Sequence, residues 1–269
     1  EKGIDIKVVT TLHGTDITLV GNHPNYKTAV SFSINKSDIV TSVSQSLKDD
    51  TYKLFNIKKE IHVIPNFIEL DKIRNESQIS CHRSVMAKKE ERIVTHISNF
   101  RKVKRIPDII KIFYKIQEKI PAKLMMVGDG PEKVKAEQLC KELGIEEKVI
   151  FFGNSSEIDQ ILSYSDLFLL PSETESFGLA ALEAMAWSVP VISSNSGGLP
   201  EVNFDGISGY LSNVGDVDSM AENALKILTD DATLAKFRES ALEIAQQFDI
   251  KKILPLYEAL YHEAINNSK

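Results

Sequence analysis

The sequence predicts an α/β protein built from doubly wound parallel sheets. Two observations support this prediction: short Val- and Ile-rich runs bounded by Gly, Pro, Asn or Ser recur along the chain, and segments with helical periodicity separate them. Such runs are too short for buried helices and are apolar at successive positions, as strands buried on both faces are. The expected strands lie in IKVVTTL, SDIVTSVS, IHVIP, RIVTHIS, AKLMMVG, KVIFFG, SDLFLLP and VPVISS.

Amphipathic patterns between these runs predict the helices that cover the sheets. The segment RIPDIIKIFYKIQEKI carries a 3.6-residue apolar stripe formed by Ile106, Ile109, Ile110, Phe113 and Ile116. Further helices are expected in PEKVKAEQLCKEL, SEIDQILSYS, FGLAALEAMAW, VDSMAENALKILTD and ATLAKFRESALEIAQQF. Strand and helix therefore alternate along the chain, which is the pattern of parallel α/β sheets.

A domain boundary is expected near residue 70. Residues 1–70 supply about three strands, a small sheet for a stable domain, so we expect an N-terminal Rossmann-like domain that is incomplete in this chain. Residues 71–91 are polar without a clear period and are expected to form a linker. Residues 92–249 are expected to form a complete Rossmann-like domain, and residues 250–269 a helix that packs back on the first domain.

Composition narrows the classes of function. The chain has 269 residues, 42% hydrophobic and 26% charged, with a net charge of −6, which is typical of a globular protein and argues against nucleic acid as a partner. Cys81 and Cys140 are isolated, and no secretory signal is recognised at the start, so a reducing, cytoplasmic location is expected. No apolar run approaches the ~20 residues of a membrane span, so stable membrane insertion is not expected.

Cations follow the expected strand at 92–98, where ligands bind in open α/β sheets. Arg101, Lys102, Lys104 and Arg105 fall within five residues. Such a group forms either a solvated surface or a clamp for a diphosphate, because Arg binds phosphate oxygens bidentately and Lys adds a point charge. No interleaved aromatic residues support a nucleic-acid patch.

A second candidate site follows the strand in SDLFLLP, within SETESFGLAALEAMA. We expect a helix to start near Ser176 or Phe177, which leaves the backbone amides of Phe177, Gly178 and Leu179 unpaired. Amides at a helix start bind phosphate or hydroxyl oxygens, and glycine lets a ligand approach closely. The segment therefore predicts a binding loop at a strand end.

Two glutamates in this segment differ in their expected surroundings. Glu175 stands before the helix start, where a carboxylate is ordinarily favoured by the helix dipole. Glu183 falls in the second turn of an otherwise apolar helix, where burial is unfavourable unless hydrogen bonds compensate. Paired hydroxyl groups of a sugar would supply those hydrogen bonds.

Other polar residues have ordinary structural explanations. His13 ends the first expected strand, where it either belongs to a turn or faces a ligand. Asp216 and Asp218 open a helix, and a capping role is expected rather than metal binding. The histidines show no metal-ligand spacing, and the dinucleotide fingerprint, the P-loop and the G-x-S-x-G motif are absent.

The combined motifs resemble the retaining glycosyltransferases of family 4, which have the two-domain GT-B fold. ESFGLAALE matches the family's E-x7-E motif, and SNFRKVKR, VGDGP, SGGLPE and DGISGYL occur in the family's order. TTLHGTDIT, SDIVTSVS, PNFI and HISNFRKVKR resemble members that transfer N-acetylglucosamine from UDP-GlcNAc to L-malate, the first step of bacillithiol biosynthesis. A family member with another acceptor, or a truncated nucleotide-sugar-binding module without turnover, stays an alternative.

The resemblance implies a role for each candidate residue. Arg101 and Lys104 would bind the diphosphate and stabilise the leaving group, with Arg105 as a neighbour. Glu183 would accept hydrogen bonds from the ribose, and Glu175 would contact the donor sugar. The remaining assignments are sugar and phosphate contacts for the amides of Phe177, Gly178 and Leu179, the uracil site for Gly153, the donor sugar for His13, and the acceptor region for Thr11 and Asn66.

The resemblance also implies what the reaction needs. UDP-GlcNAc and L-malate are the expected small-molecule partners, no metal or other cofactor is expected, and a homo-oligomer is compatible with the family. The chain departs from the family in two places. Family members begin with a glycine-rich loop that is missing here, and Ser31 stands where relatives often carry a basic residue suited to an acceptor carboxylate.

Overall fold

The computed structural model describes residues 6–18, 23–76 and 83–266. The chain divides into two compact units. The N-terminal unit comprises Glu1–Phe67, Glu175–Phe177 and Phe248–Lys269, and the C-terminal unit comprises Ile68–Thr174 and Gly178–Gln247. Each unit is described by itself.

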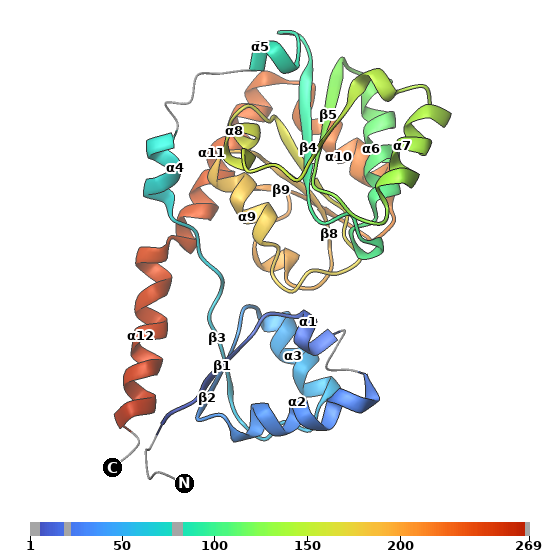
Figure 1. Ribbon diagram of the computed structural model, residues 1–269. Coiled ribbons are helices and arrows are strands. Elements are labelled where there is room, and N and C mark those ends of the chain that lie inside the picture. The colour runs from blue at the N-terminus through green and yellow to red at the C-terminus, as the bar shows by residue number, and fades with distance from the viewer. Residues whose placement is uncertain (1–5, 19–22, 77–82, 267–269) are drawn as a thin grey trace. The chain divides into compact units, whose positions relative to one another are not determined.

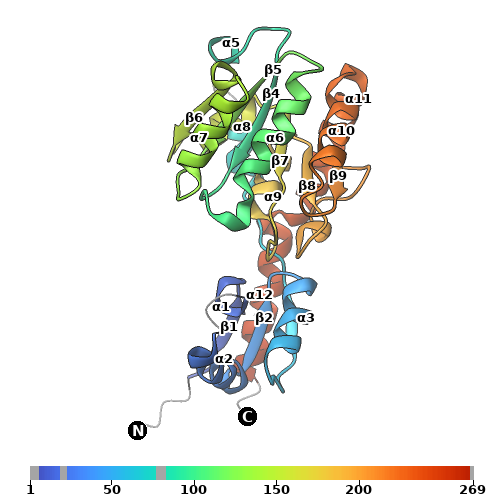
Figure 2. The same cartoon turned by 90° about the vertical axis from the view of Figure 1, so that its right-hand side faces the viewer.

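The C-terminal unit contains a six-stranded sheet with the order β6-β5-β4-β7-β8-β9, in which every neighbouring pair is parallel (Figures 1 and 2). Its strands are β4 (Arg92–Ile97), β5 (Ala122–Val127), β6 (Val149–Gly153), β7 (Leu167–Leu170), β8 (Val191–Ser194) and β9 (Gly209–Ser212). This order confirms the predicted doubly wound α/β class. The sequence did not reveal β9, because its four residues, GYLS, show neither an apolar run nor clear alternation.

Helices cover both faces of this sheet, as Figures 1 and 2 show. The larger core joins the sheet to α6 (Ile106–Gln117), α7 (Lys133–Glu142), α10 (Val217–Leu228) and α11 (Asp231–Ala245). A smaller cluster on the other face includes side chains from α8 (Ile158–Ser163). All five apolar residues of the predicted α6 stripe are fully buried, which explains why this helix was evident from the sequence.

The N-terminal unit contains a three-stranded parallel sheet in the order β1-β2-β3. Its strands are β1 (Val9–Leu12), β2 (Ile39–Ser42) and β3 (Ile61–Val63), and its helices are α1 (Thr15–Thr18), α2 (Pro24–Lys36), α3 (Gln45–Leu54) and α12 (Ile250–Asn266). The sequence analysis missed α1, α2 and α3. The reason is clearest in α2, where only Ile34 is buried and no apolar stripe exists.

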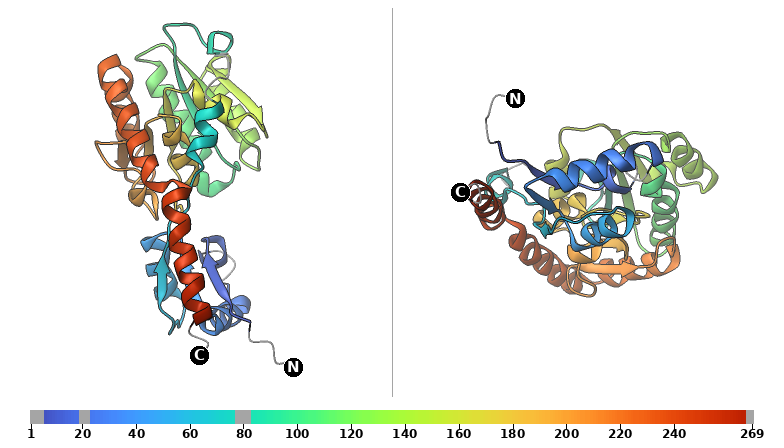
Figure 3. Two further views of the ribbon diagram at one scale, coloured as in Figure 1. Left: turned by 90° about the vertical axis from the view of Figure 1, so that its left-hand side faces the viewer. Right: turned by 90° about the horizontal axis from the view of Figure 1, so that it is seen from below.

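The C-terminal helix α12 packs against the N-terminal sheet, as Figure 3 shows. Burial is the main cause that raises the pKa of Tyr257 on this helix. The Tyr257 hydroxyl lies close enough to the side chains of Thr11 in β1 and Thr41 in β2 for both to lower its pKa. The helix therefore closes one face of this small sheet with a polar contact inside the interface.

The expected linker contains short helices, α4 (Leu70–Glu76) and α5 (Arg83–Met86). Residues 77–82 of that linker, including Cys81, lie outside the described residues. Cys140 is a free, buried thiol on α7, and burial is the main cause that raises its pKa to about 11. None of the helices in the described ranges is both long and apolar enough to cross a membrane.

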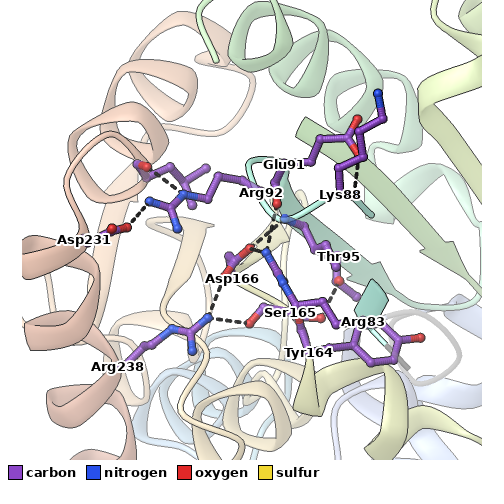
Figure 4. Close-up of polar contacts among 12 residues, drawn as sticks. Arg83, Lys88, Glu91, Arg92, Thr95, Tyr164, Ser165, Asp166, Asp231 and Arg238 are labelled. Carbon is purple, nitrogen blue, oxygen red and sulfur yellow. Dashed lines mark hydrogen bonds and ion pairs between the residues drawn. The ribbon is translucent and has the colours of Figure 1, made fainter. Parts of the chain in front are cut away.

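The amino edge of the C-terminal sheet is closed by an ion-pair network around Asp166 (Figure 4). One carboxylate oxygen accepts hydrogen bonds from Arg83 at 2.9 Å and from the amide of Ile93 at 2.8 Å, and the other accepts from Arg238 at 2.6 Å. The Asp166 side chain is only 5% exposed, so these bonds compensate a nearly complete loss of hydration. The network joins α5, β4 and α11 to the start of β7.

Candidate functional site

The candidate site lies at the carboxyl edge of the C-terminal sheet, where β4 is flanked by β5 on one side and β7 on the other. The chain builds the sheet outward from β4 first through β5 and β6, then through β7, β8 and β9. Ligands bind beyond the carboxyl ends of the strands at such a switch point. Arg101 and Lys104 follow β4, and Glu175, Phe177 and Gly178 follow β7. Leu179 and Glu183 lie on the next helix, and Gly153 is the last residue of β6.

The cation-rich segment after β4 forms a short 3₁₀ turn, η1 (Lys102–Lys104). Arg101 precedes the turn and is exposed, whereas Lys104 is half-buried. Arg105 adopts a left-handed φ of 52°, and its Nε donates a hydrogen bond to Asp108 Oδ2 at 2.5 Å. Arg105 is thus engaged with Asp108 at the start of α6. Arg101 and Lys104, the two cations predicted to bind the diphosphate, lie before and within the same turn.

The loop after β5 packs directly against the loop after β4. A Cβ atom at Gly128 would lie 1.8 Å from the carbonyl oxygen of Ser98, so only glycine allows this approach. The amide of Phe100 donates to the Asp129 carbonyl at 2.9 Å, and the amide of Glu132 donates to the Phe100 carbonyl at 2.9 Å. The glycines of VGDGP therefore fix the backbone that leads to Arg101.

Hydrogen bonds also join the loops that follow β4, β7 and β8. The amide of Glu173 donates to the Val103 carbonyl at 2.7 Å, and its carbonyl accepts from Ser196 Oγ at 2.8 Å. Ser194 Oγ donates to the Ser172 carbonyl at 2.5 Å. These contacts hold the segment after β7 next to the cation-rich turn, while the Glu173 side chain itself is exposed.

The helix after β7 begins later than predicted. We expected its start near Ser176 or Phe177, but α9 spans Leu179–Ala186. Gly178 precedes the helix with a left-handed φ of 99°, which interrupts the helical backbone. A Cβ atom at this position would also lie 2.7 Å from Leu199 Cδ2, the end of a side chain. The left-handed backbone is therefore the main reason for glycine here.

The later start changes which amides are available to a ligand. Ala181 already donates to the Gly178 carbonyl at 3.0 Å, so Leu179 and Ala180 present the first amides of α9 without a helical partner. Leu179 therefore keeps its predicted role as a helix-start donor. The amides of Phe177 and Gly178 precede the first helical residue, and their contacts with a ligand stay predictions.

Glu183 occupies the second turn of α9, as the sequence predicted, and is half-buried. Burial is the main cause that raises its pKa, and the nearby carboxylate of Asp159 raises it further. Asp159 itself accepts a hydrogen bond from Trp187 Nε1 at 3.0 Å. A partly dehydrated carboxylate of this kind is stabilised by hydroxyl donors, which a polyhydroxylated ligand supplies.

Glu175 is half-buried and belongs to the three residues that cluster with the N-terminal unit. The carbonyl of its neighbour Ser176 accepts a hydrogen bond from Ser44 Oγ at 2.5 Å. A Cβ atom at Gly14 would lie 2.5 Å from Ser176 Cβ, so Gly14, the neighbour of His13, packs against the side chain of Ser176, the neighbour of Glu175. The structure thus brings the segments carrying His13 and Glu175 together.

The other candidates of the N-terminal unit occupy strand ends. His13 is exposed after β1, and Asn66 is half-buried beyond β3. Thr11 is half-buried in β1, and its hydroxyl accepts a hydrogen bond from Thr41 Oγ1 at 2.9 Å. Ser31, the position that departs from the family, is half-buried on α2. The roles of these residues toward a ligand stay predictions.

The aspartates at the start of α10 have structural partners. Asp216 caps the helix by accepting a hydrogen bond from the amide of Ser219 at 3.0 Å, which confirms the capping prediction. Asp218 pairs with Lys115 at 2.8 Å. A search of the described residues finds no group of three or more His, Cys, Asp or Glu side chains arranged to hold a metal ion.

The sequence analysis overlooked His96, which is fully buried in β4. Its Nδ1 contacts the Leu169 carbonyl at 2.8 Å, and its Nε2 contacts Ser98 Oγ at 2.7 Å. Burial is the main cause that lowers its pKa to about 4; the Leu169 hydrogen bond raises the pKa, and the charge of Lys104 lowers it further. No spacing motif marks this residue, because its partner Leu169 lies on another strand.

Models of known families match most of the chain. The model of the family described as "Glycosyl transferases group 1" matches residues 78–244. The model of the family described as "Glycosyltransferase Family 4" matches residues 2–72. The chain is 42% identical over 268 residues to an N-acetyl-alpha-D-glucosaminyl L-malate synthase from Bacillus anthracis, covering 99% of this chain and 70% of that protein. It is 31% identical to an uncharacterised glycosyltransferase from Methanocaldococcus jannaschii, covering 82% of this chain and 60% of that protein.

Solved structures share the fold. The crystal structure of Anabaena HepE in complex with UDP-glucose superposes with a TM-score of 0.84 at 22% identity, covering 95% of this chain and 72% of that chain. At this level of identity the likeness establishes the architecture and not the substrate. The predicted GT-B architecture is thereby confirmed.

Proposed function

Because the chain belongs to the glycosyl transferases group 1 family, we propose that it transfers N-acetylglucosamine from UDP-GlcNAc to L-malate with retention of the anomeric configuration. The carrying observation is the 42% identity to the malate synthase, which extends over 99% of this chain. The chain spans 70% of that relative's length. The geometry of the C-terminal unit supports the part of the proposal that concerns binding of UDP.

The diphosphate of UDP would bind between the loops that follow β4 and β7. Arg101 is exposed just beyond β4, and Lys104 follows on the same turn. The first amides of α9, at Leu179 and Ala180, would donate to phosphate oxygens, with the helix dipole favouring negative charge. The α9 amides are held by the helix backbone before the leaving group develops its charge, which is the condition for effective electrostatic stabilisation.

The remaining candidates would surround the sugar, the base and the acceptor. Glu183 would accept hydrogen bonds from the ribose hydroxyls, which restores partners to its half-buried carboxylate. Glu175 and His13 would contact the donor sugar, consistent with the packing of their neighbours Ser176 and Gly14 against each other. The other proposed contacts are uracil for Gly153 and the acceptor for Thr11 and Asn66.

The chemical step would break the bond between the anomeric carbon and the UDP oxygen. A bond forms between that carbon and the hydroxyl oxygen of L-malate, on the face that the diphosphate leaves. The hydroxyl proton passes to the departing phosphate, so the products are the α-glycoside and UDP. Arg101, Lys104 and the α9 amides would meet the charge that develops on UDP, and no metal is proposed.

The proposal is tested by measuring UDP release from UDP-GlcNAc in the presence of L-malate. Succinate is the matched control acceptor, because it carries both carboxylates but lacks the hydroxyl that receives the sugar. We expect release that depends on L-malate and is absent with succinate. Equal release with both acids would contradict the malate assignment, and a flat calorimetric titration with UDP would contradict the nucleotide-sugar site altogether.

Two variants test the division of roles between the glutamates. Glu183→Ala is expected to weaken UDP binding, since it removes the ribose acceptor. Glu175→Ala is expected to leave UDP affinity nearly unchanged and to reduce the rate of sugar transfer. Equal losses of UDP affinity in both variants, measured by calorimetry, would contradict this division.

A further inference from the structure

Strands β4 and β7 stop pairing before they reach the candidate site. In the parallel pairing of β4 with β7, Val94 lies opposite Leu167 and Thr95 lies opposite Phe168. The later residues of the two strands are not paired with each other. On its other side β4 stays paired with β5 as far as Ile97 and Val127. The ladder between β4 and β7 therefore ends before either strand does, directly beneath the candidate site.

The imidazole of His96 fills this gap. It contacts the Leu169 carbonyl of β7 at 2.8 Å and Ser98 Oγ, just beyond β4, at 2.7 Å. The rings of Phe100 and Phe168 are also close, with centroids 6.2 Å and 6.3 Å from that of His96. One buried side chain thus replaces the missing backbone pairing between the two strand ends.

The direction of each hydrogen bond follows from the groups involved. A carbonyl oxygen can only accept, so Nδ1 of His96 carries the proton and donates to Leu169. The neutral imidazole then has only an acceptor at Nε2, and the hydroxyl of Ser98 must donate to it. The Ser98 hydroxyl proton therefore points into the protein and not toward a ligand.

Both partners begin segments that the proposed function uses. The chain runs from Ser98 directly to Arg101, and from Leu169 it runs through the loop to Gly178 and α9. A shift of about 1 Å between donors that share one ligand can cost on the order of 100-fold in rate. The group that fixes the two strand ends is therefore placed to control how well the cations and the α9 amides converge.

We infer that His96 is a positioning residue for the diphosphate site, which sets the spacing between the loops after β4 and β7 by joining Leu169 to Ser98. The inference rests on the proposed function for the identity of the ligand. His96 is buried and does not touch the ligand, so its effect passes through Ser98 and Leu169. Neither the E-x7-E motif nor the cation-rich segment includes it.

Three variants separate the two hydrogen bonds. Ser98→Ala removes the Ser98 bond without opening a large cavity. His96→Asn places an amide near the position of Nδ1, so it keeps a donor for Leu169 but loses the Ser98 bond. His96→Gln places an acceptor near the position of Nε2, so it keeps the Ser98 bond and loses the Leu169 bond.

Thr95→Val is the matched control. Thr95 is the neighbouring residue on β4, is also fully buried, and its hydroxyl bonds with Ser165 Oγ at 2.6 Å just before β7. It therefore also links β4 to the β7 segment, but at the amino side of the strands. A purely structural role for His96 would make this variant behave like the His96 variants.

The experiment is calorimetric titration of each variant with UDP, together with thermal unfolding. We expect Kd for UDP to rise about tenfold in His96→Asn and about fivefold in Ser98→Ala, and to change less than twofold in Thr95→Val despite a lower Tm. The double variant His96→Asn/Ser98→Ala is expected to bind no more weakly than His96→Asn alone, because both lose the same bond.

The outcomes distinguish the inference from the proposed function. Unchanged UDP affinity in both His96→Asn and Ser98→Ala, with normal binding by the parent protein, overturns the inference and leaves the proposed function intact. No UDP binding by the parent protein removes the proposed function and with it the ligand. Nitrogen NMR that places the His96 proton on Nε2 instead of Nδ1 also overturns the inference.

Discussion

The two edges of the C-terminal sheet both present arginines, but the arginines differ in their partners. At the amino edge, Arg83 and Arg238 share Asp166, and Arg92 pairs with Asp231 (Figure 4). At the carboxyl edge, Arg101 is exposed, and within the described residues it has no carboxylate in ion-pairing distance. The same residue type therefore serves different purposes at the two edges, and the partner decides which.

The difference has an energetic reason. When a guanidinium pairs with a nearly buried carboxylate, charged hydrogen bonds between the two groups replace the hydration that each has lost. Fewer of its N–H donors are then available to a ligand. An exposed guanidinium keeps its hydration and its donors, so it contributes little to folding but can bind a phosphate bidentately. Substitutions at the amino edge should therefore change stability, and substitutions at the carboxyl edge should change ligand affinity.

The largest effect is expected from Asp166→Ala. It leaves two guanidinium groups and the amide of Ile93 without their shared acceptor, so the free energy of unfolding should fall by roughly 3–5 kcal/mol. The measurement is urea denaturation, with Asp218→Ala as control, because Asp218 is 77% exposed in its pair with Lys115.

The comparison of edges would fail if the Asp166 variant were as stable as the control. It would also fail if the folded Asp166 variant bound UDP more weakly than the parent protein. Should Asp166→Ala not fold, Asp166→Asn retains one acceptor oxygen and is expected to give a smaller loss of stability in the same assay.

His96 predicts a loss of stability in acid. Its pKa is lowered from 6.5 to about 4 in the folded protein, mainly by burial, so the unfolded chain binds the proton more tightly. Stability should therefore fall as the pH drops from about 6.5 to 4, by about 3 kcal/mol in total. Urea denaturation of the parent protein and of His96→Gln across this range isolates the contribution, since other titrating groups affect both proteins.

A parallel decline in both proteins would show that His96 does not titrate as its burial implies. The charged group that acts on His96 is Lys104, which lowers the pKa of His96 in the same direction as burial does. The effect differs from that of Asp166, because it originates at the carboxyl edge yet changes stability. His96 is therefore an exception to the rule that substitutions at the carboxyl edge change ligand affinity and not stability.

Arg101→Ala is expected to weaken UDP binding by about 100-fold, or ~3 kcal/mol, because it removes a bidentate charged donor from the diphosphate. The free energy of unfolding should change by less than about 0.5 kcal/mol, since Arg101 is exposed. Arg101→Lys, which keeps the charge but not the planar fork, should lose affinity to a smaller extent. Calorimetry with UDP measures both variants, and an unstable Arg101→Ala protein would contradict the comparison.

Much of this architecture was accessible from the sequence because its signals are local. The α6 stripe is buried residue by residue, and the strand-end rule directed attention to Arg101 and Glu183. The resemblance to the E-x7-E motif then indicated separate roles for Glu175 and Glu183, which their spacing alone did not define. Helices such as α2 were missed because they bury too little apolar surface to leave a period.

The features that escaped depend on contacts between distant segments. The start of α9 is set by Gly178, whose left-handed backbone sits against Leu199. His96 acquires its function from Leu169, on a strand that follows 73 residues later. Neither contact has a local signature, so a single sequence could not place the helix start or identify the buried histidine.

The smallest effect is expected from Glu183→Gln. This variant tests whether the charge of a residue at the carboxyl edge lowers the stability of the protein. Burial raises the pKa of Glu183 because the folded protein disfavours its charge. Glutamine keeps the shape and removes the charge, so the variant should be more stable than the parent protein at neutral pH. Its affinity for UDP should fall about tenfold, because a neutral amide is a weaker acceptor for ribose hydroxyls than a carboxylate.

Thermal unfolding and calorimetry with UDP provide the two measurements, with the exposed Glu222→Gln on α10 as control. The stability difference between the parent protein and Glu183→Gln should narrow as the pH is lowered, because the folded parent takes up its proton more readily than the unfolded chain. Lower stability with unchanged affinity would place Glu183 with the structural carboxylates of the amino edge. Higher stability with weaker binding would show that the carboxyl edge retains a destabilising charge because the ligand needs it.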